Sequence, residues 1–215
     1  MFGLLIIFIL CFLQREQLYT YLAAPLLKQL PAGNTLIATQ VTAPFLAPMK
    51  LSFILAIFLN IPICCYHLWS FIAPGLYIQE KKSILPLVIL SCILFYLGML
   101  FAFVIICPLA LKFFANCAPH GVSIMTDIAN YLDFMLAMLF AAGVAFQIPI
   151  VTIMLIKFGI VTKYQLAKMR PFMIVLAFIL GMLLTPPDVV SQILLALPMW
   201  GLFELGLLLV QAPKA

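Results

Sequence analysis

The sequence predicts an all-α membrane protein. Of its 215 residues, 67% are hydrophobic and only 8% are charged, and the mean hydropathy is +1.29. No soluble domain of this length can bury so much apolar surface, so lipid must surround most of the chain. The apolar runs are continuous rather than alternating, which favours spanning helices over β-barrel strands. No internal repeat or low-complexity linker divides the chain, so we expect residues 1–215 to form one membrane domain with six helices.

The N-terminal part predicts an incomplete span followed by a polar segment. Residues 1–13 are apolar but only about 18 Å long as a helix, and they lack the basic start and cleavage site of a signal peptide. We therefore expect the second half of a spanning helix whose first half is missing. Within the polar residues 14–48, residues 16–27 are expected to form an amphipathic surface helix that ends near Pro25, and the remainder is expected to be rich in turns.

Three longer apolar runs predict the second, third and fourth helices. Their expected bounds are 49–70, 83–113 and 131–157. Proline should bend the second helix near Pro62, and the fourth contains Pro149. Asp133 lies near the outer start of the fourth helix and is expected to cap it or to lie at an interface. Polar loops at about 71–82 and 115–130 connect these helices.

The last two helices are joined by the most informative segment of the chain. The fifth helix holds only thirteen residues, 172–184, which is about 20 Å of helix against a bilayer core of about 30 Å. The turn Thr185-Pro186-Pro187-Asp188 ends it because proline blocks helical hydrogen bonding, and Asp188 can cap the sixth helix, at about 189–210. Backbone groups left unpaired in lipid are costly, so this outer turn predicts a locally thinned, hydrated bilayer.

The basic residues indicate how the chain is oriented. The loops between helices two and three and between helices four and five, together with the tail, hold Lys81, Lys82, Lys157, Lys163, Lys168, Arg170 and Lys214, whereas the opposite side holds Arg15, Lys28, Lys50 and Lys112. The positive-inside rule therefore places the first group and both termini in the cytoplasm. The scattered charge does not indicate nucleic-acid binding. Neither metal-ligand spacing nor a nucleophile–base arrangement is present, so we expect no metal, no cofactor and no enzymatic activity.

Three polar residues are candidates for a functional site. Glu80 is the only acid in the cytoplasmic loops, and it either offsets Lys81 and Lys82 or accepts a cationic ligand such as an arginine. Gln147 lies mid-span, where an unpartnered amide is costly, so it either links two helices or forms a docking site. Glu204 lies about fifteen residues into the sixth helix and is either a functional intramembrane acid or a residue of the cytoplasmic interface.

With these residues in place, the chain resembles the TatC family, the multispanning subunits of the twin-arginine protein translocase. Three segments carry the resemblance: Phe71-Ile72-Ala73-Pro74-Gly75-Leu76-Tyr77 with Glu80-Lys81-Lys82, Phe146-Gln147-Ile148-Pro149, and Gly181-Met182-Leu183-Leu184-Thr185-Pro186-Pro187-Asp188 continuing through Gln192 to Glu204. The resemblance covers nearly the whole chain in one register. It departs from the family in lacking an N-terminal His-Leu-x-Glu-Leu-Arg motif and in having Gln147 where many members have a glutamate.

The resemblance implies a curved, cupped wall of six helices in the bacterial cytoplasmic membrane. Such a protein is a receptor for twin-arginine precursors and, with single-span partners of the TatA and TatB type, transports folded proteins. It also implies several copies of the chain within a receptor complex. The residues implied in signal-peptide binding are Glu80, Phe71, Pro74, Leu76 and Tyr77. Those implied in docking the single-span partners are Gln147, Met182, Thr185, Gln192 and Glu204.

A second class of function also fits part of the pattern. A small-solute secondary transporter would use Gln147 and the broken fifth and sixth helices as a midplane site. Inverted repeats would favour that interpretation, and none is detected in the sequence. A purely structural membrane scaffold is a third alternative. Co-purification distinguishes them, because only a translocase receptor should retain single-span amphipathic partners and twin-arginine precursors.

Overall fold

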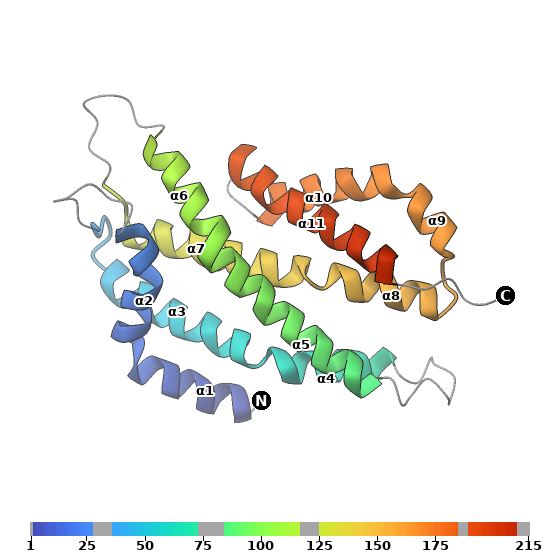
Figure 1. The fold of residues 1–215 in the computed structure, drawn as a ribbon. Coiled ribbons are helices and arrows are strands. Elements are labelled where there is room, and N and C mark those ends of the chain that lie inside the picture. The colour runs from blue at the N-terminus through green and yellow to red at the C-terminus, as the bar shows by residue number, and fades with distance from the viewer. Residues whose placement is uncertain (1, 28–35, 73–83, 117–124, 185–188, 210–215) are drawn as a thin grey trace.

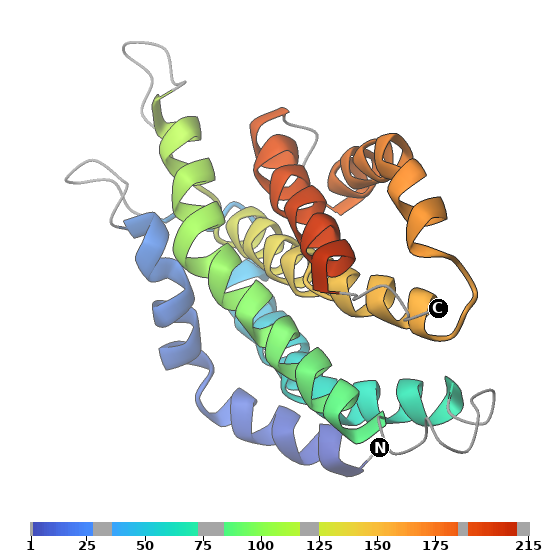
Figure 2. The same ribbon diagram turned by 45° about the vertical axis from the view of Figure 1, so that its right-hand side comes forward.

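The described residues form a curved wall of helices that lie side by side (Figures 1 and 2). The computed structural model describes residues 2–27, 36–72, 84–116, 125–184 and 189–209. One edge of the wall is formed by α1 (Phe2–Leu13) and α2 (Arg15–Leu27), and the other by α10 (Arg170–Leu184). The predicted all-α membrane fold is confirmed.

Helix length and composition identify the membrane spans in the described part of the chain. Three stretches are long and apolar enough to cross a membrane, and their bounds are Pro86–Asn116, Ile128–Lys157 and Val189–Leu209. Two bent pairs pass the same test together, each as a broken span or a re-entrant loop: α1 with α2, at 75°, and α3 (Ala43–Leu59) with α4 (Ile61–Ile72), at 45°. Together with the shorter α10, these correspond to the six predicted helices. The bend predicted near Pro62 is confirmed.

The span of α3 and α4 begins at Ala43, about six residues before its predicted start. The sequence indicated turns there because of two prolines. Pro44 lies in the first turn of α3, however, where an N–H group would have no helical partner. Pro48 lies one turn further in, and the Ser52 hydroxyl donates to its carbonyl at 2.9 Å. Both prolines are therefore tolerated within the helix.

The helix predicted at 83–113 is continuous from Ile84 to Asn116 but contains a local change of winding. It consists of α5 (Ile84–Phe101), the π-helical segment η3 (Ala102–Ile106) and α6 (Cys107–Asn116). The Cys107 N–H donates to the Ala102 carbonyl, five residues earlier. Pro108 follows immediately and has no N–H to donate, so the wider turn accommodates it without ending the helix.

The centre of the wall is α7 (Ile128–Ala145), which continues after a short break as α8 (Ile148–Lys157). Its residues Leu132, Met135 and Met138 are fully buried and belong to the largest hydrophobic cluster. Gly98 of α5 allows the two helices to pack closely, because a Cβ atom at this position would lie 2.6 Å from the Ala142 carbonyl oxygen. Small residues commonly permit such approaches between membrane helices.

The segment after α8 contains a helix where only a loop was expected. This helix, α9 (Lys163–Lys168), begins with a capping box in which Thr162 and Gln165 satisfy each other's backbone N–H groups. It leads to α10, which packs against α11 (Val189–Leu209). The helix expected at residues 16–27 is α2, which runs from Arg15 to Leu27: Glu16, Gln17, Thr20 and Tyr21 are exposed, and Leu22 and Ala23 pack into the core.

Candidate functional sites

The loop predicted to recognise a cationic ligand connects α4 and α5, which pack against each other. Glu80, Pro74, Leu76 and Tyr77 lie outside the described residues, and Phe71 belongs to the last turn of α4. The end of α4, the start of α5, the end of α8 and α9 all lie at one end of the molecule (Figure 1). This end carries the basic residues Lys157, Lys163, Lys168 and Arg170.

Gln147 lies at the break between α7 and α8 and is half-buried. Its side-chain Nε2 donates to the Ser91 carbonyl of α5 at 2.9 Å. Because a backbone carbonyl of a neighbouring helix accepts this bond, the structure favours the first of the two predicted roles, that of an amide linking helices. Pro149 follows in the first turn of α8, where it cannot donate a helical bond, and this explains why the helix is interrupted here.

Gln192, in the first turn of α11, makes a similar link to α10. Its Nε2 donates to the Phe178 carbonyl of α10 at 2.8 Å. A Cβ atom at Gly181 would lie 3.2 Å from the Gln192 Cγ atom, so the glycine gives the glutamine room. Met182 is 65% exposed on the same turn of α10. Thr185, Pro186, Pro187 and Asp188, which form the predicted outer turn, lie outside the described residues.

The structure does not bring the two intramembrane amides together. Gln147 bonds to α5, whereas Gln192 bonds to α10. Gly206 of α11 packs against Pro149 and Thr152 of α8, close to the level of Gln147, whereas Gln192 lies fourteen residues, or about 21 Å, before Gly206 in α11. Gln147 and Gln192 therefore belong to two separate helix contacts, and their expected role in docking single-span partners stays a prediction.

Glu204 forms a bidentate ion pair with Arg170. The carboxylate oxygens accept from the arginine Nε at 2.8 Å and from an Nη atom at 2.9 Å. The Glu204 side chain is 24% exposed and that of Arg170 is 53% exposed. Arg170 begins α10 at the end of the molecule that carries α9. Glu204 therefore lies near this end, where the ion pair holds α10 against α11. This arrangement favours the interface role over that of an unpaired intramembrane acid.

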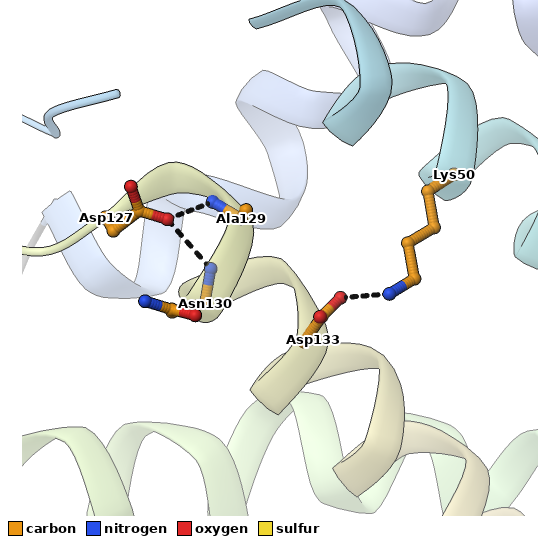
Figure 3. Close-up of polar contacts among 5 residues, drawn as sticks. All are labelled: Lys50, Asp127, Ala129, Asn130 and Asp133. Atoms are coloured by element: carbon orange, nitrogen blue, oxygen red, sulfur yellow. Dashed lines mark hydrogen bonds and ion pairs between the residues drawn. The ribbon is translucent and has the colours of Figure 1, made fainter. Parts of the chain in front are cut away.

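At the opposite end of the molecule, Asp127 joins the segment around Thr39 to the start of α7. One carboxylate oxygen caps α7 by accepting from the Ala129 and Asn130 N–H groups at 2.8 and 3.1 Å (Figure 3). The other accepts from the hydroxyl and the N–H of Thr39, and a parallel β-bridge pairs Asp127 with Ile37. The Thr39 hydroxyl, together with the backbone donors, lowers the pKa of Asp127 to about 2.

Sequence reasoning missed Asp127 as the helix cap and considered Asp133 for that role. Asp133 instead lies within α7 and forms an ion pair with Lys50 of α3, 2.6 Å from Nζ to Oδ1 (Figure 3). The correction follows from the helix boundary, because α7 begins at Ile128, three residues before its predicted start. An aspartate directly before an apolar run is itself a capping signal and would have located this boundary.

Comparison with known proteins adds independent information. A family model described as Sec-independent protein translocase protein (TatC) matches residues 1–198. The Escherichia coli strain K12 protein of that name is 47% identical over 204 residues, which cover 95% of this chain and 79% of the relative. The Haemophilus influenzae protein of that name is 52% identical over 196 residues, covering 91% and 77%.

A solved structure is similar over almost the same length. A crystal structure described as the twin-arginine translocase receptor TatC matches with a TM-score of 0.84 at 36% identity. The match covers 96% of this chain and 91% of the solved chain. The sequence and structure comparisons therefore point to the same proteins.

Proposed function

The chain belongs to the TatC family of Sec-independent protein translocase proteins, and from this premise we propose that it is a receptor for twin-arginine signal peptides. The observation that carries the proposal is its match, over 96% of its length, to a structure described as the twin-arginine translocase receptor. A protein translocase family also favours this function over that of a small-solute transporter. In the proposed role, residues 1–215 act as one membrane domain that passes folded precursors across the bacterial cytoplasmic membrane.

We place recognition of the signal peptide in the loop between α4 and α5. Glu80, the only acid in the cytoplasmic loops, would accept a guanidinium group, and Phe71, Pro74, Leu76 and Tyr77 would contact the apolar residues that follow. An exposed arginine–carboxylate pair contributes only about 0.2–1 kcal/mol. Glu80 would therefore select for arginine, while packing of the apolar segment against the helices would provide most of the affinity.

We place docking of single-span TatA- and TatB-type partners at the outer ends of α10 and α11, around Met182, Thr185 and Gln192. The exposure of Met182 supports this, as does the close packing of Gly181 against Gln192, which leaves a shallow helix surface there. Gln147 and Glu204 would act from outside this patch, by holding α7 to α5 and α10 to α11.

The proposed orientation follows from the distribution of charge. The end with Lys157, Lys163, Lys168 and Arg170 would face the cytoplasm, and the end fastened by Asp127 would face outward. In this orientation the fifteen residues of α10, about 22 Å, fall short of the hydrocarbon core of about 30 Å. The bilayer would be thinned beside α10, and this would lower the barrier to a passing folded protein.

Photocrosslinking of a twin-arginine precursor in membranes tests the receptor proposal. Glu80→Ala and Glu80→Lys should weaken crosslinking to the protein, because the carboxylate that accepts the guanidinium group is lost. Lys81→Ala is the matched control, since it changes the charge of the same loop but keeps the acid. Undiminished crosslinking to Glu80→Lys, in protein inserted at normal levels, would refute the proposal.

A further inference from the structure

An apolar groove between α3 and α7 is closed at one end by an ion pair. Its volume is about 460 Å³. The apolar lining is Ile54, Ile57, Phe58, Leu136, Ala137 and Phe140, and the pair at its end is Lys50 with Asp133. Each of the two charged side chains is about half exposed, at 51% and 54%. A carboxylate accepts several hydrogen bonds and an ammonium donates three, so this exposed pair can take further polar partners.

The depth of the ion pair matches the boundary between lipid headgroups and hydrocarbon. The span of α3 and α4, Ala43 to Ile72, is about 45 Å long, comparable with a bilayer of about 40–45 Å including headgroups. Lys50 lies about 10 Å from the start of this span, and Asp133 about 8 Å from the start of α7. The charges therefore lie near headgroup level, and the apolar groove extends from them into the hydrocarbon.

The shape and lining of the groove suit a hydrocarbon chain. The groove extends about 10 Å from Asp133 to Phe140, and the side chains between these two residues that line it are apolar. A hydrocarbon chain that starts at the ion pair can therefore lie along it.

We propose that this groove binds one acyl chain of a phospholipid whose headgroup is phosphoethanolamine. Lys50 would donate to the phosphate, and the primary ammonium of the headgroup would donate to Asp133. The two opposite charges of the ion pair would thus match the two opposite charges of the zwitterionic headgroup. A phosphoglycerol headgroup has no cation for Asp133. A choline headgroup has a cation but no N–H to donate. This site is distinct from the proposed signal-peptide and partner sites and does not depend on them.

Native mass spectrometry of the purified full chain with dioleoyl lipids tests the proposal. The protein should retain the phosphoethanolamine lipid about twofold to fivefold better than the choline or glycerol lipid, because the partly exposed contact of its ammonium with Asp133 distinguishes it from them. Asp133→Asn should abolish most of this preference, because the carboxylate that accepts from the ammonium is lost. Lys50→Gln should lower retention of all three lipids, because each of them carries the phosphate. Ala137→Phe, which fills the groove and keeps the ion pair, should lower retention of the bound lipid. Lys112→Gln, which removes a lysine away from the groove, should change neither.

Two outcomes would overturn the proposal. One is equal retention of the phosphoethanolamine and choline lipids by the unmodified protein, which would make the groove an unselective part of the lipid-facing surface. The other is a preference that persists in Asp133→Asn together with unchanged lipid retention by Ala137→Phe, when these variants melt at the same temperature as the unmodified protein. That result would place the lipid elsewhere on the molecule.

Discussion

At the scale of single residues, Asp127 connects two distant segments of the chain. Because Thr39 and the first turn of α7 stabilise the carboxylate, the pKa of Asp127 falls from 3.8 to about 2. A lowered pKa stabilises the folded state fully above about pH 4, and this contribution is lost as the pH falls through about 2. We expect Asp127→Asn to lower the melting temperature at pH 7 by a few degrees. The part of the fall in melting temperature below about pH 4 that Asp127 causes should then be absent.

Thermal melts in detergent between pH 2 and pH 7 measure this effect. Asp133→Asn is the matched control, because it removes an acid from the same helix and leaves the contacts of Thr39 intact. If Asp127→Asn and the unmodified protein give parallel curves of melting temperature against pH, the Thr39 contact does not stabilise the fold.

The ion pair of Arg170 and Glu204 supports a second prediction at this scale. Its two parallel hydrogen bonds require the planar guanidinium group. Arg170→Lys should therefore destabilise the protein nearly as much as Glu204→Gln, by about 1 kcal/mol. A double-mutant cycle measured by denaturant unfolding should give a coupling energy of about 0.5–1 kcal/mol. A coupling energy near zero would mean that the pair does not hold α10 to α11.

Among these site residues, the sequence indicated which were polar in lipid but not what they contact. Gln147 and Glu204 were identified because polar groups are costly in lipid. Their partners are a carbonyl 56 positions away and an arginine 34 positions away, and both were unknown before the helices were placed. For this reason the sequence alone could not show that Gln147 and Gln192 belong to two separate helix contacts.

At the scale of elements, two glycines in helices test how closely the wall is packed. A methyl group at Gly98 would lie 2.6 Å from the Ala142 carbonyl oxygen, whose backbone cannot move away cheaply, so Gly98→Ala should cost about 1–3 kcal/mol. At Gly201 no atom lies within 4 Å, and Gly201→Ala should be neutral or stabilising by up to about 1 kcal/mol. Unfolding free energies for both variants provide the measurement. Equal effects would contradict the close contact of α5 with α7.

The short α10 supports a prediction about transport. Inserting seven apolar residues after Phe178 would lengthen α10 from about 22 Å to about 33 Å. Because seven residues make nearly two turns, the residues after the insertion would face nearly the same direction as before. If thinning of the bilayer beside α10 assists transport, this variant should insert normally but export poorly. Val175→Leu combined with Ile179→Leu changes composition without length and should export normally. Normal export by the lengthened protein would contradict the thinning proposal.

The helices were predictable where apolar runs end at proline or charge. This signal predicted a fifth helix at 172–184, and α10 begins two residues earlier, at Arg170. Hydrophobic periodicity gave little help, because helices in lipid are apolar on every side. Thus the burial of Leu22 in α2 and the π-helical turn before Pro108 depend on neighbours that no local pattern records. The missed helix α9 did carry a local signal, the capping box that starts at Thr162.

At the scale of the whole molecule, the helices form a wall whose two ends are held by different polar contacts. At one end Asp127 ties the segment around Thr39 to α7, and at the other Arg170 and Glu204 tie α10 to α11. Along the centre, Gln147 ties the kinked span of α7 and α8 to α5. These polar links hold the helices in place within lipid, where apolar burial alone provides little driving force. The wall can therefore present a fixed surface to the signal peptide and the single-span partners that we propose for it.

The affinity of the purified protein for two peptides tests the receptor claim most directly. One is a twin-arginine signal peptide, and the other is the same peptide with both arginines replaced by lysine, so that total charge is equal. Because a carboxylate accepts a guanidinium group through two bonds, the arginine peptide should bind severalfold more tightly, and Glu80→Gln should remove the difference. Equal affinity of the unmodified protein for both peptides would contradict the account.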